Sequence, residues 1–73
     1  MEQHLALIVS IEPSAESESL LAFLAEAGFE GFEELSDRLI AYRPADAWDP
    51  AEVNAYLTDH GLLFSYDTLQ KTN

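Results

Sequence analysis

The stretch LAEAGFEGFEELSDRLIAYR, residues 24–43, holds most of the information about the fold. Gly28 follows a leucine-rich helical pattern and is placed to end that helix in the left-handed conformation. The residues after it predict a strand with an irregularity at Gly31, because Phe29 and Phe32 are an odd number of positions apart and cannot both face the core on a regular strand. We therefore expect a helix that is followed directly by a strand.

The second half of this stretch predicts a β-hairpin. The strand after the helix is expected to cover residues 29–35, and the polar residues Ser36 and Asp37 suit a tight turn. Residues 39–43, LIAYR, then return as the next strand, which Pro44 ends because proline cannot donate to a strand ladder.

A strand and a helix are predicted before this stretch. Residues 5–11, LALIVSI, are rich in valine and isoleucine and favour a buried central strand. The heavier face of this strand, which is expected to meet the core, carries Leu5, Leu7, Val9 and Ile11. Ser14 then suits the N-cap of a helix of about 13 residues, in which leucines recur at helical spacing.

A second helix and a last strand are predicted after the hairpin. Asp49 is a suitable N-cap, Pro50 suits the first helical position, and Trp48 is expected to pack against Val53 as a hydrophobic staple. His60 and Gly61 suit the end of this helix. The final strand is expected over residues 62–69.

The order of elements is strand, helix, strand, strand, helix, strand. Two split βαβ units with right-handed crossovers predict an α+β, ferredoxin-like sandwich. Its four strands would form one antiparallel sheet in the order 4-1-3-2, with both helices on one face. Residues 1–73 are expected to make a single domain of this kind.

The size and composition of the chain limit what it can do. It has 73 residues, 48% of them hydrophobic, which predicts one small packed domain, too short for a Rossmann-type catalytic domain. It has no cysteine, so a disulfide framework and a thiolate zinc site are both excluded. No signal peptide or apolar run of membrane-spanning length is present, and we expect a soluble, cytoplasmic protein.

The chain is strongly acidic. It has 14 acidic residues against three basic ones, Arg38, Arg43 and Lys71, and a formal net charge of −11. Such a field repels the phosphate backbone of a nucleic acid and attracts a basic protein. We therefore expect a basic protein partner and no direct binding of nucleic acid or membrane.

The sequence predicts no catalytic or metal-binding residue. Glu30, Glu33 and Glu34 offer neighbouring carboxylates, but no nucleophile or basic group accompanies them. His4 and His60 are far apart in sequence, and neither belongs to a metal-ligand pattern.

A phosphate-binding loop is not predicted either. Gly28 and Gly31 resemble a glycine-rich loop only in composition, because phosphate loops precede a helix N-terminus and this one follows a helix C-terminus. We therefore expect no cofactor in this segment.

Three segments together resemble a known family. These are LLAFLAEAGFEGFEE at residues 20–34, RLIAYRP at residues 38–44 and DPAEVNAYL at residues 49–57. They are similar to the N-terminal domain of the bacterial methyltransferases that modify large-subunit ribosomal protein eleven, over about residues 9–66. The resemblance implies a ferredoxin-like domain that recognises the ribosomal protein and presents it to a separate Rossmann-like domain, which binds S-adenosylmethionine and methylates amino groups.

On this resemblance the chain would be the substrate-recognition part of a longer, two-domain protein methyltransferase and would be inactive alone. The alternative is a free-standing, acidic ferredoxin-like module for protein interaction or regulation. In either case we expect the partner to meet a sheet face or an acidic strand edge. The candidate contact residues are Ile8, Ala41 and Ser65 on the sheet and the acidic residues Glu30, Glu33 and Glu34.

Overall fold

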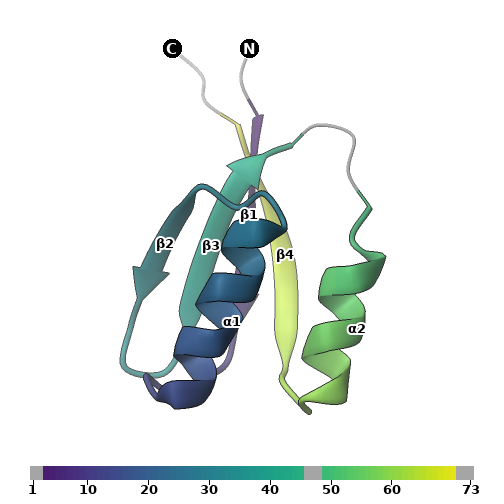
Figure 1. Ribbon diagram of the computed structural model, residues 1–73. Helices are drawn as coiled ribbons and strands as arrows, with labels where there is room; N and C mark the ends of the chain where they lie inside the picture. Colours follow the sequence, from purple (N-terminus) through teal and green to yellow (C-terminus); the bar gives the residue numbers. More distant parts are fainter. Residues whose placement is uncertain (1–2, 46–48, 71–73) are drawn as a thin grey trace.

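The computed structural model describes residues 3–45 and 49–70, which form two helices and four strands (Figure 1). In chain order these are β1 (Gln3–Val9), α1 (Ala15–Glu26), β2 (Gly31–Glu34), β3 (Leu39–Pro44), α2 (Ala51–Asp59) and β4 (Phe64–Gln70). The strands make one antiparallel sheet in the order β2-β3-β1-β4, and both helices lie on one face of it. The predicted ferredoxin-like fold and its strand order are confirmed, since 4-1-3-2 is the same order read from the other edge.

The strand β1 lies at the centre of the sheet, with β3 on one side and β4 on the other. The pairing of β1 with β4 extends along the whole of both strands, and Gln3 at the start of β1 lies opposite Gln70 at the end of β4. These two strand ends therefore meet at one end of the sheet (Figure 1).

The core lies between the sheet and the helices. The heavier face of β1 meets it as predicted, because Leu7 and Val9 are fully buried and Ile11, just beyond the strand, is 8% exposed. The other large members of the core are Leu20, Leu24, Phe29, Leu39, Val53 and Leu57. Each fully buried leucine contributes about 1.5–3 kcal/mol of transfer free energy, so this layer of side chains holds the helices on the sheet.

The start of α1 confirms Ser14 as the N-cap. The Ser14 hydroxyl accepts a hydrogen bond from the backbone N–H of Ser17 at 3.3 Å, and the Ser17 hydroxyl accepts one from the backbone N–H of Ser14 at 2.7 Å. This reciprocal pair is a capping box with serine in the place usually taken by glutamate or glutamine.

Both helices end in the same way. Gly28 has a φ of +102°, and the N–H of Phe29 after it donates to the carbonyl of Leu24 at 3.0 Å. Gly61 has a φ of +66°, and the N–H of Leu62 after it donates to the carbonyl of Leu57 at 2.9 Å. These are Schellman motifs, and they satisfy helix carbonyls that would otherwise lack a donor. The two predicted C-cap glycines are confirmed.

The predicted irregularity at Gly31 is present at the start of β2. Gly31 lies opposite Tyr42 in the ladder, yet the N–H of Glu30 also donates to the carbonyl of Tyr42 at 2.8 Å. Two residues therefore face one, as in a β-bulge, and this offset lets both Phe29 and Phe32 pack against the core. The regular strand is shorter than predicted, because Phe29 lies in the connection before it.

At the start of α2, the Asp49 carboxylate accepts a hydrogen bond from the backbone N–H of Ala51 at 3.0 Å, and Pro50 stands between them. The helix begins at Ala51 with Pro50 at its N-cap, so the predicted assignment of Asp49 as the N-cap and Pro50 as the first helical residue is one position too early. Asp49 still satisfies one N–H at the start of the helix. The predicted contact of Trp48 falls outside the described residues.

Candidate functional site

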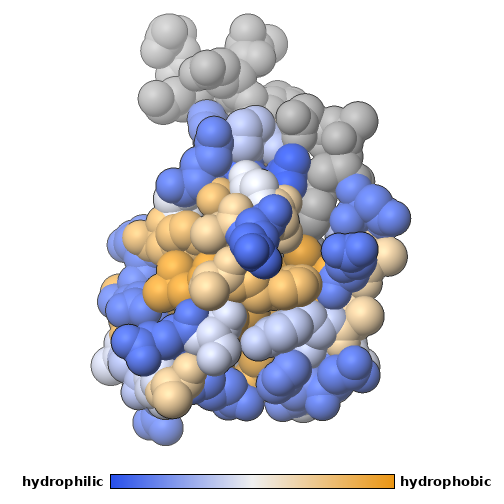
Figure 2. Space-filling view, in the orientation of Figure 1, coloured by the Kyte–Doolittle hydropathy of each residue, from blue (hydrophilic) through white to orange (hydrophobic). Residues whose placement is uncertain are grey.

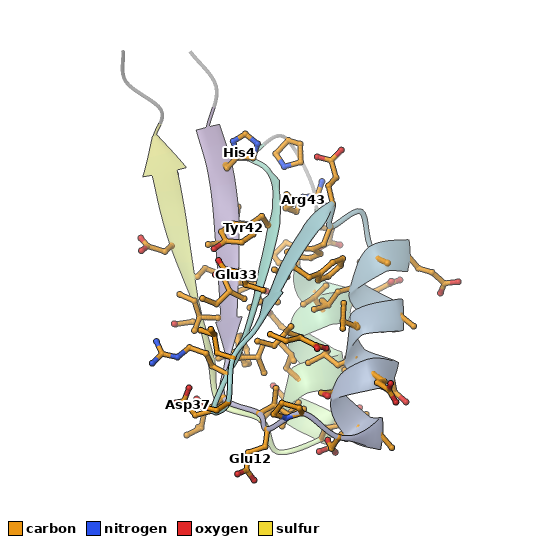
Figure 3. All side chains as sticks on the ribbon, turned by 90° about the vertical axis from the view of Figure 1, so that its left-hand side faces the viewer. His4, Glu12, Glu33, Asp37, Tyr42 and Arg43 are labelled. Carbon is orange, nitrogen blue, oxygen red and sulfur yellow. The ribbon has the colours of Figure 1, made fainter. Side chains whose placement is uncertain are left out.

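One face of the sheet carries no helix (Figure 3). Successive residues of a strand point to opposite faces of the sheet. The buried residues identify the face that the helices cover, and the register then gives the residues of the open face. The open face is made by Gly31 and Glu33 of β2, Ile40, Tyr42 and Pro44 of β3, His4, Ala6 and Ile8 of β1, and Ser65 and Asp67 of β4.

The open face has apolar residues at its centre and acidic ones at its two sides. Ile8 of β1 lies opposite Ile40 of β3, and the neighbouring pair joins Ala6 to Tyr42. The outer strand β2 adds Glu33 beside Ile40, and the outer strand β4 adds Asp67 beside Ala6. Ile8 and Ile40 are half-buried, while Glu33 and Asp67 are exposed. The two central strands thus form an apolar floor with one carboxylate on each side.

Glu33 is held in place by a neighbour on the same face. The hydroxyl of Tyr42 donates to Oε1 of Glu33 at 2.7 Å (both labelled in Figure 3). This hydrogen bond to the carboxylate raises the pKa of the Tyr42 phenol above its usual value, so the phenol stays protonated at neutral pH. The Glu33 carboxylate is therefore oriented beside the floor.

The two arginines bond to other parts of the chain and not to the carboxylates of the open face. Arg43 is on the helix-covered side of β3, and its Nη1 donates to the carbonyl of Ala27 at 2.9 Å. Arg38 pairs with its neighbour Asp37 at 3.2 Å in the exposed turn between β2 and β3. Neither guanidinium pairs with Glu33 or Asp67 in the described hydrogen bonds and ion pairs.

The structure brings three of the six predicted contact residues into one line. Glu33, Ile8 and Ser65 lie in the same cross-strand row of the open face, with Ile40 between the first two. The prediction for Ala41 is wrong, because this residue is 1% exposed and faces the core from β3.

The other two predicted glutamates lie away from the open face. Glu30 is exposed before the start of β2. Glu34 lies opposite Leu39, on the side of the sheet that carries the helices. The three glutamates are therefore not one cluster, and only Glu33 can contact a molecule on the open face.

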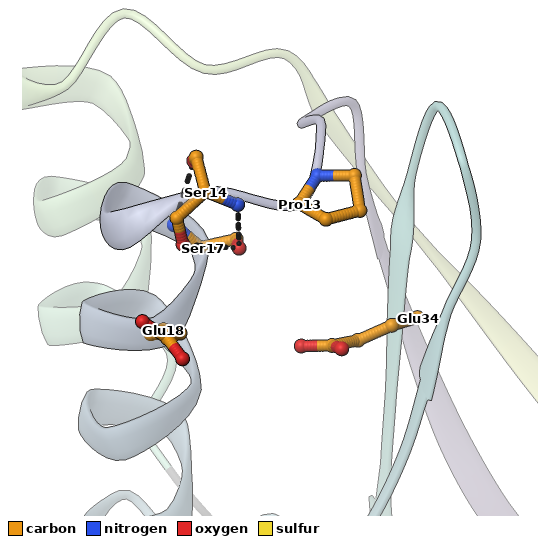
Figure 4. Close-up of a pocket in the computed structure, with 5 residues that line it drawn as sticks. All are labelled: Pro13, Ser14, Ser17, Glu18 and Glu34. Carbon is orange, nitrogen blue, oxygen red and sulfur yellow. Dashed lines mark hydrogen bonds between the residues drawn. The ribbon is translucent and has the colours of Figure 1, made fainter.

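A shallow pocket of about 250 Å³ lies where Glu34 faces the start of α1 (Figure 4). It is lined by Pro13, Ser14, Ser17, Glu18 and Glu34. Both serine hydroxyls already make the helix cap, and the other polar groups are two carboxylates. The two hydroxyls donate to the backbone carbonyls of Glu12 and Ser14 and not to a carboxylate, so these five residues do not form an activated nucleophile.

The helix side also shows hydrophobic surface. In Figure 2 this surface gathers over and beside α1 and is surrounded by hydrophilic residues. The ring of Phe23 on α1 stacks on Tyr56 of α2 with centroids 4.3 Å apart, and Tyr56 stacks on His60 at 4.2 Å. Phe23 and Tyr56 also pack against the core.

Two kinds of site are not found in the described part of the chain. Within residues 3–45 and 49–70, no group of three or more histidine, cysteine, aspartate or glutamate side chains could hold a metal ion. Over the same residues, no helix has the length and apolar character needed to cross a membrane.

Sequence reasoning missed Ile40, Tyr42 and Asp67. In the segment LIAYR, one face carries Leu39, Ala41 and Arg43 and the other carries Ile40 and Tyr42. Both faces hold apolar residues, and the arginine favours solvent for the face that in fact meets the core. The choice of Ala41 for the open face assumed the wrong set. Asp67 could have been found, because it lies two positions after Ser65 and shares its face.

Comparisons with protein-family models, with curated proteins and with solved structures found no match.

Proposed function

We propose that this chain is a recognition domain that binds a basic protein. The observation that carries the proposal is the arrangement of charge: the net charge is −11, both described arginines are bonded within the chain, and the open face holds two carboxylates beside apolar residues, of which Glu33 is oriented by Tyr42. An acidic surface of this kind attracts a basic protein from solution, and apolar contact area then slows its release.

The resemblance of the sequence makes the proposal more specific. The partner would be a basic ribosomal protein in the cytoplasm, and the chain would be the substrate-recognition domain of an S-adenosylmethionine-dependent protein methyltransferase. Binding of S-adenosylmethionine and methyl transfer would then belong to a separate domain. The role of the present residues would be to bind the ribosomal protein and to increase its local concentration at that domain.

The test is a titration of the chain with purified large-subunit ribosomal protein eleven at low and at raised salt. We expect saturable binding at low salt that weakens as salt rises, because screening reduces attraction between the two surfaces. A second basic protein of similar net charge serves as the control and should bind more weakly. If neither protein associates at low salt, the proposed function is wrong; if both bind equally, the partner is basic but not specifically ribosomal.

A further inference from the structure

The cross-section of the open face defines which shape of partner it accepts. The outer strands carry one acidic side chain each, Glu33 in β2 and Asp67 in β4, and mainly apolar residues of β3 and β1 lie between them. The two carboxylates lie in adjacent cross-strand rows, because Glu33 shares its row with Ser65 and Asp67 shares its row with Gly31. Neighbouring strands lie about 4.8 Å apart, so the strands of Glu33 and Asp67 are separated by about 14 Å. An α-helix with its side chains is about 10–12 Å across and fits between these two carboxylates.

The length of the apolar floor also suits a short helix. The floor runs along β3 from Ile40 to Pro44, which at about 3.4 Å per residue is about 14 Å. A helix rises about 1.5 Å per residue, so about nine residues would cover this distance. Ala6 is only 4% exposed, so its neighbours cover it and the contact area on this face comes from the larger side chains around it, such as Ile8 and Ile40.

Other occupants fit the open face less well. A single extended segment would leave its backbone groups unpaired over apolar side chains, whereas a helix satisfies them internally. A second copy of this chain would bring its own Glu33 and Asp67 against the same residues and would add another net charge of −11. A helix with basic residues at both sides of an apolar stripe meets the floor and both carboxylates at once.

We propose that the open face binds an amphipathic α-helix of the basic partner. The apolar stripe of this helix lies on Ile8 and Ile40, and its lysine or arginine side chains reach Glu33 on one side and Asp67 on the other. The inference rests on the proposed function, since it names the surface of this chain and the part of the partner that meet.

The first test uses a synthetic helix of about 18 residues, with leucines at positions i, i+3, i+4 and i+7 and lysines on both sides of that stripe. A scrambled peptide has the same composition and charge but no apolar stripe. Titration calorimetry with the full chain should give binding to the amphipathic peptide at least about tenfold tighter than to the scrambled peptide.

Three paired variants then locate the contact. Ile8→Thr with Ile40→Thr removes apolar contact and keeps the β-branched shape, and Glu33→Gln with Asp67→Asn removes the two charges beside the floor. Each pair should weaken binding of the amphipathic peptide about tenfold. Glu26→Gln with Asp59→Asn is the matched control, because it makes the same charge change at the helix ends and should weaken binding by less than about threefold.

The outcomes separate this inference from the proposed function. The proposed binding of a helix to the open face is wrong if the scrambled peptide binds as tightly as the amphipathic one. It is also wrong if the control pair weakens binding as much as Glu33→Gln with Asp67→Asn. In either case the proposed recognition of basic proteins still stands. If neither the peptides nor the ribosomal protein bind at low salt, both proposals fail. Thermal unfolding of every variant shows whether a loss of binding reflects a loss of folding. The charge variants change only exposed side chains, so they still test the proposal if the variant with both isoleucines replaced does not fold.

Discussion

Arg43 joins the end of a helix to a strand through one buried guanidinium. The residue is 9% exposed, its Nη1 bonds the Ala27 carbonyl just after α1, and its Cζ lies 5.8 Å from the centroid of the Phe29 ring. The last carbonyls of a helix have no intrahelical donor and carry a partial negative charge. A cationic donor beside them is therefore favourable. Arg43 therefore stabilises the position of α1 against β3.

Replacing Arg43 by methionine tests this role. The change keeps much of the apolar stem but removes the donor to Ala27, and we expect it to lower the free energy of unfolding by about 2–3 kcal/mol. Chemical denaturation gives the value. The control is Arg38→Met, which removes an exposed ion pair with Asp37 and should cost less than about 0.5 kcal/mol. Similar losses for both variants would mean that the Arg43 bond adds little.

The sequence alone does not reveal the role of Arg43. Its partner Ala27 is 16 residues away, and the contact forms only when the end of α1 is placed beside β3. The same contact helps to explain why the orientation of β3 was predicted wrongly at Ala41. An arginine normally favours the exposed face of a strand, and here the helix end reverses that preference.

The two helix ends share one motif but have different surroundings. A Cβ atom added to Gly28 would lie 2.9 Å from Nη1 of Arg43, whereas one added to Gly61 would meet nothing within 4 Å. Both glycines have a positive φ, so both positions disfavour a side chain. Only at Gly28 would a side chain also displace a neighbour that makes a hydrogen bond.

Alanine at each position therefore separates backbone strain from steric conflict. Gly61→Ala should cost about 1 kcal/mol, from strain alone, and Gly28→Ala about 2–4 kcal/mol, because the Arg43 bond is lost as well. Denaturant unfolding measures both. Combining Gly28→Ala with Arg43→Met should give less than the sum of the single losses, since both remove one contact. This account is contradicted if the two alanine variants lose the same free energy of unfolding. It is also contradicted if the losses from Gly28→Ala and Arg43→Met add in full.

The elements themselves could be predicted because their signals are local. The cap at Ser14, the glycines at both helix ends and the odd spacing of Phe29 and Phe32 are all visible in short stretches of sequence. The open face could be predicted only in part. Which residues lie on the open face depends on which side of each strand the helices cover. In β3 that side is set by contacts with the end of α1.

At the scale of the whole molecule, electrostatic repulsion opposes folding. The net charge is −11, and the last turns of α1 and α2, both described in full, carry Glu26 and Asp59 with no basic residue. Negative charge at a helix C-terminus is unfavourable because the helix dipole is negative there. The compact state should therefore be more stable when these charges are screened.

Raising sodium chloride from low to moderate concentration should raise the midpoint of thermal unfolding. Glu26→Gln with Asp59→Asn should add about 1 kcal/mol of stability at low salt and make the dependence on salt shallower. Calorimetry across a salt series measures both effects. Sucrose, an uncharged stabiliser, should raise the midpoint equally in the parent and the variant. A midpoint that falls with salt would show that attractive charge pairs outweigh the repulsion.

The meeting of Gln3 and Gln70 at one end of the sheet has a consequence for how the chain can be reconnected. A short flexible linker could join Gln70 to Gln3 there, and the exposed turn at Ser36 and Asp37, at the far end of β2 and β3, could supply new ends. The order of the strands in space would not change. In such a circular permutant, a fused domain would emerge from the opposite end of the sheet, while the apolar floor and its two carboxylates would stay uncovered.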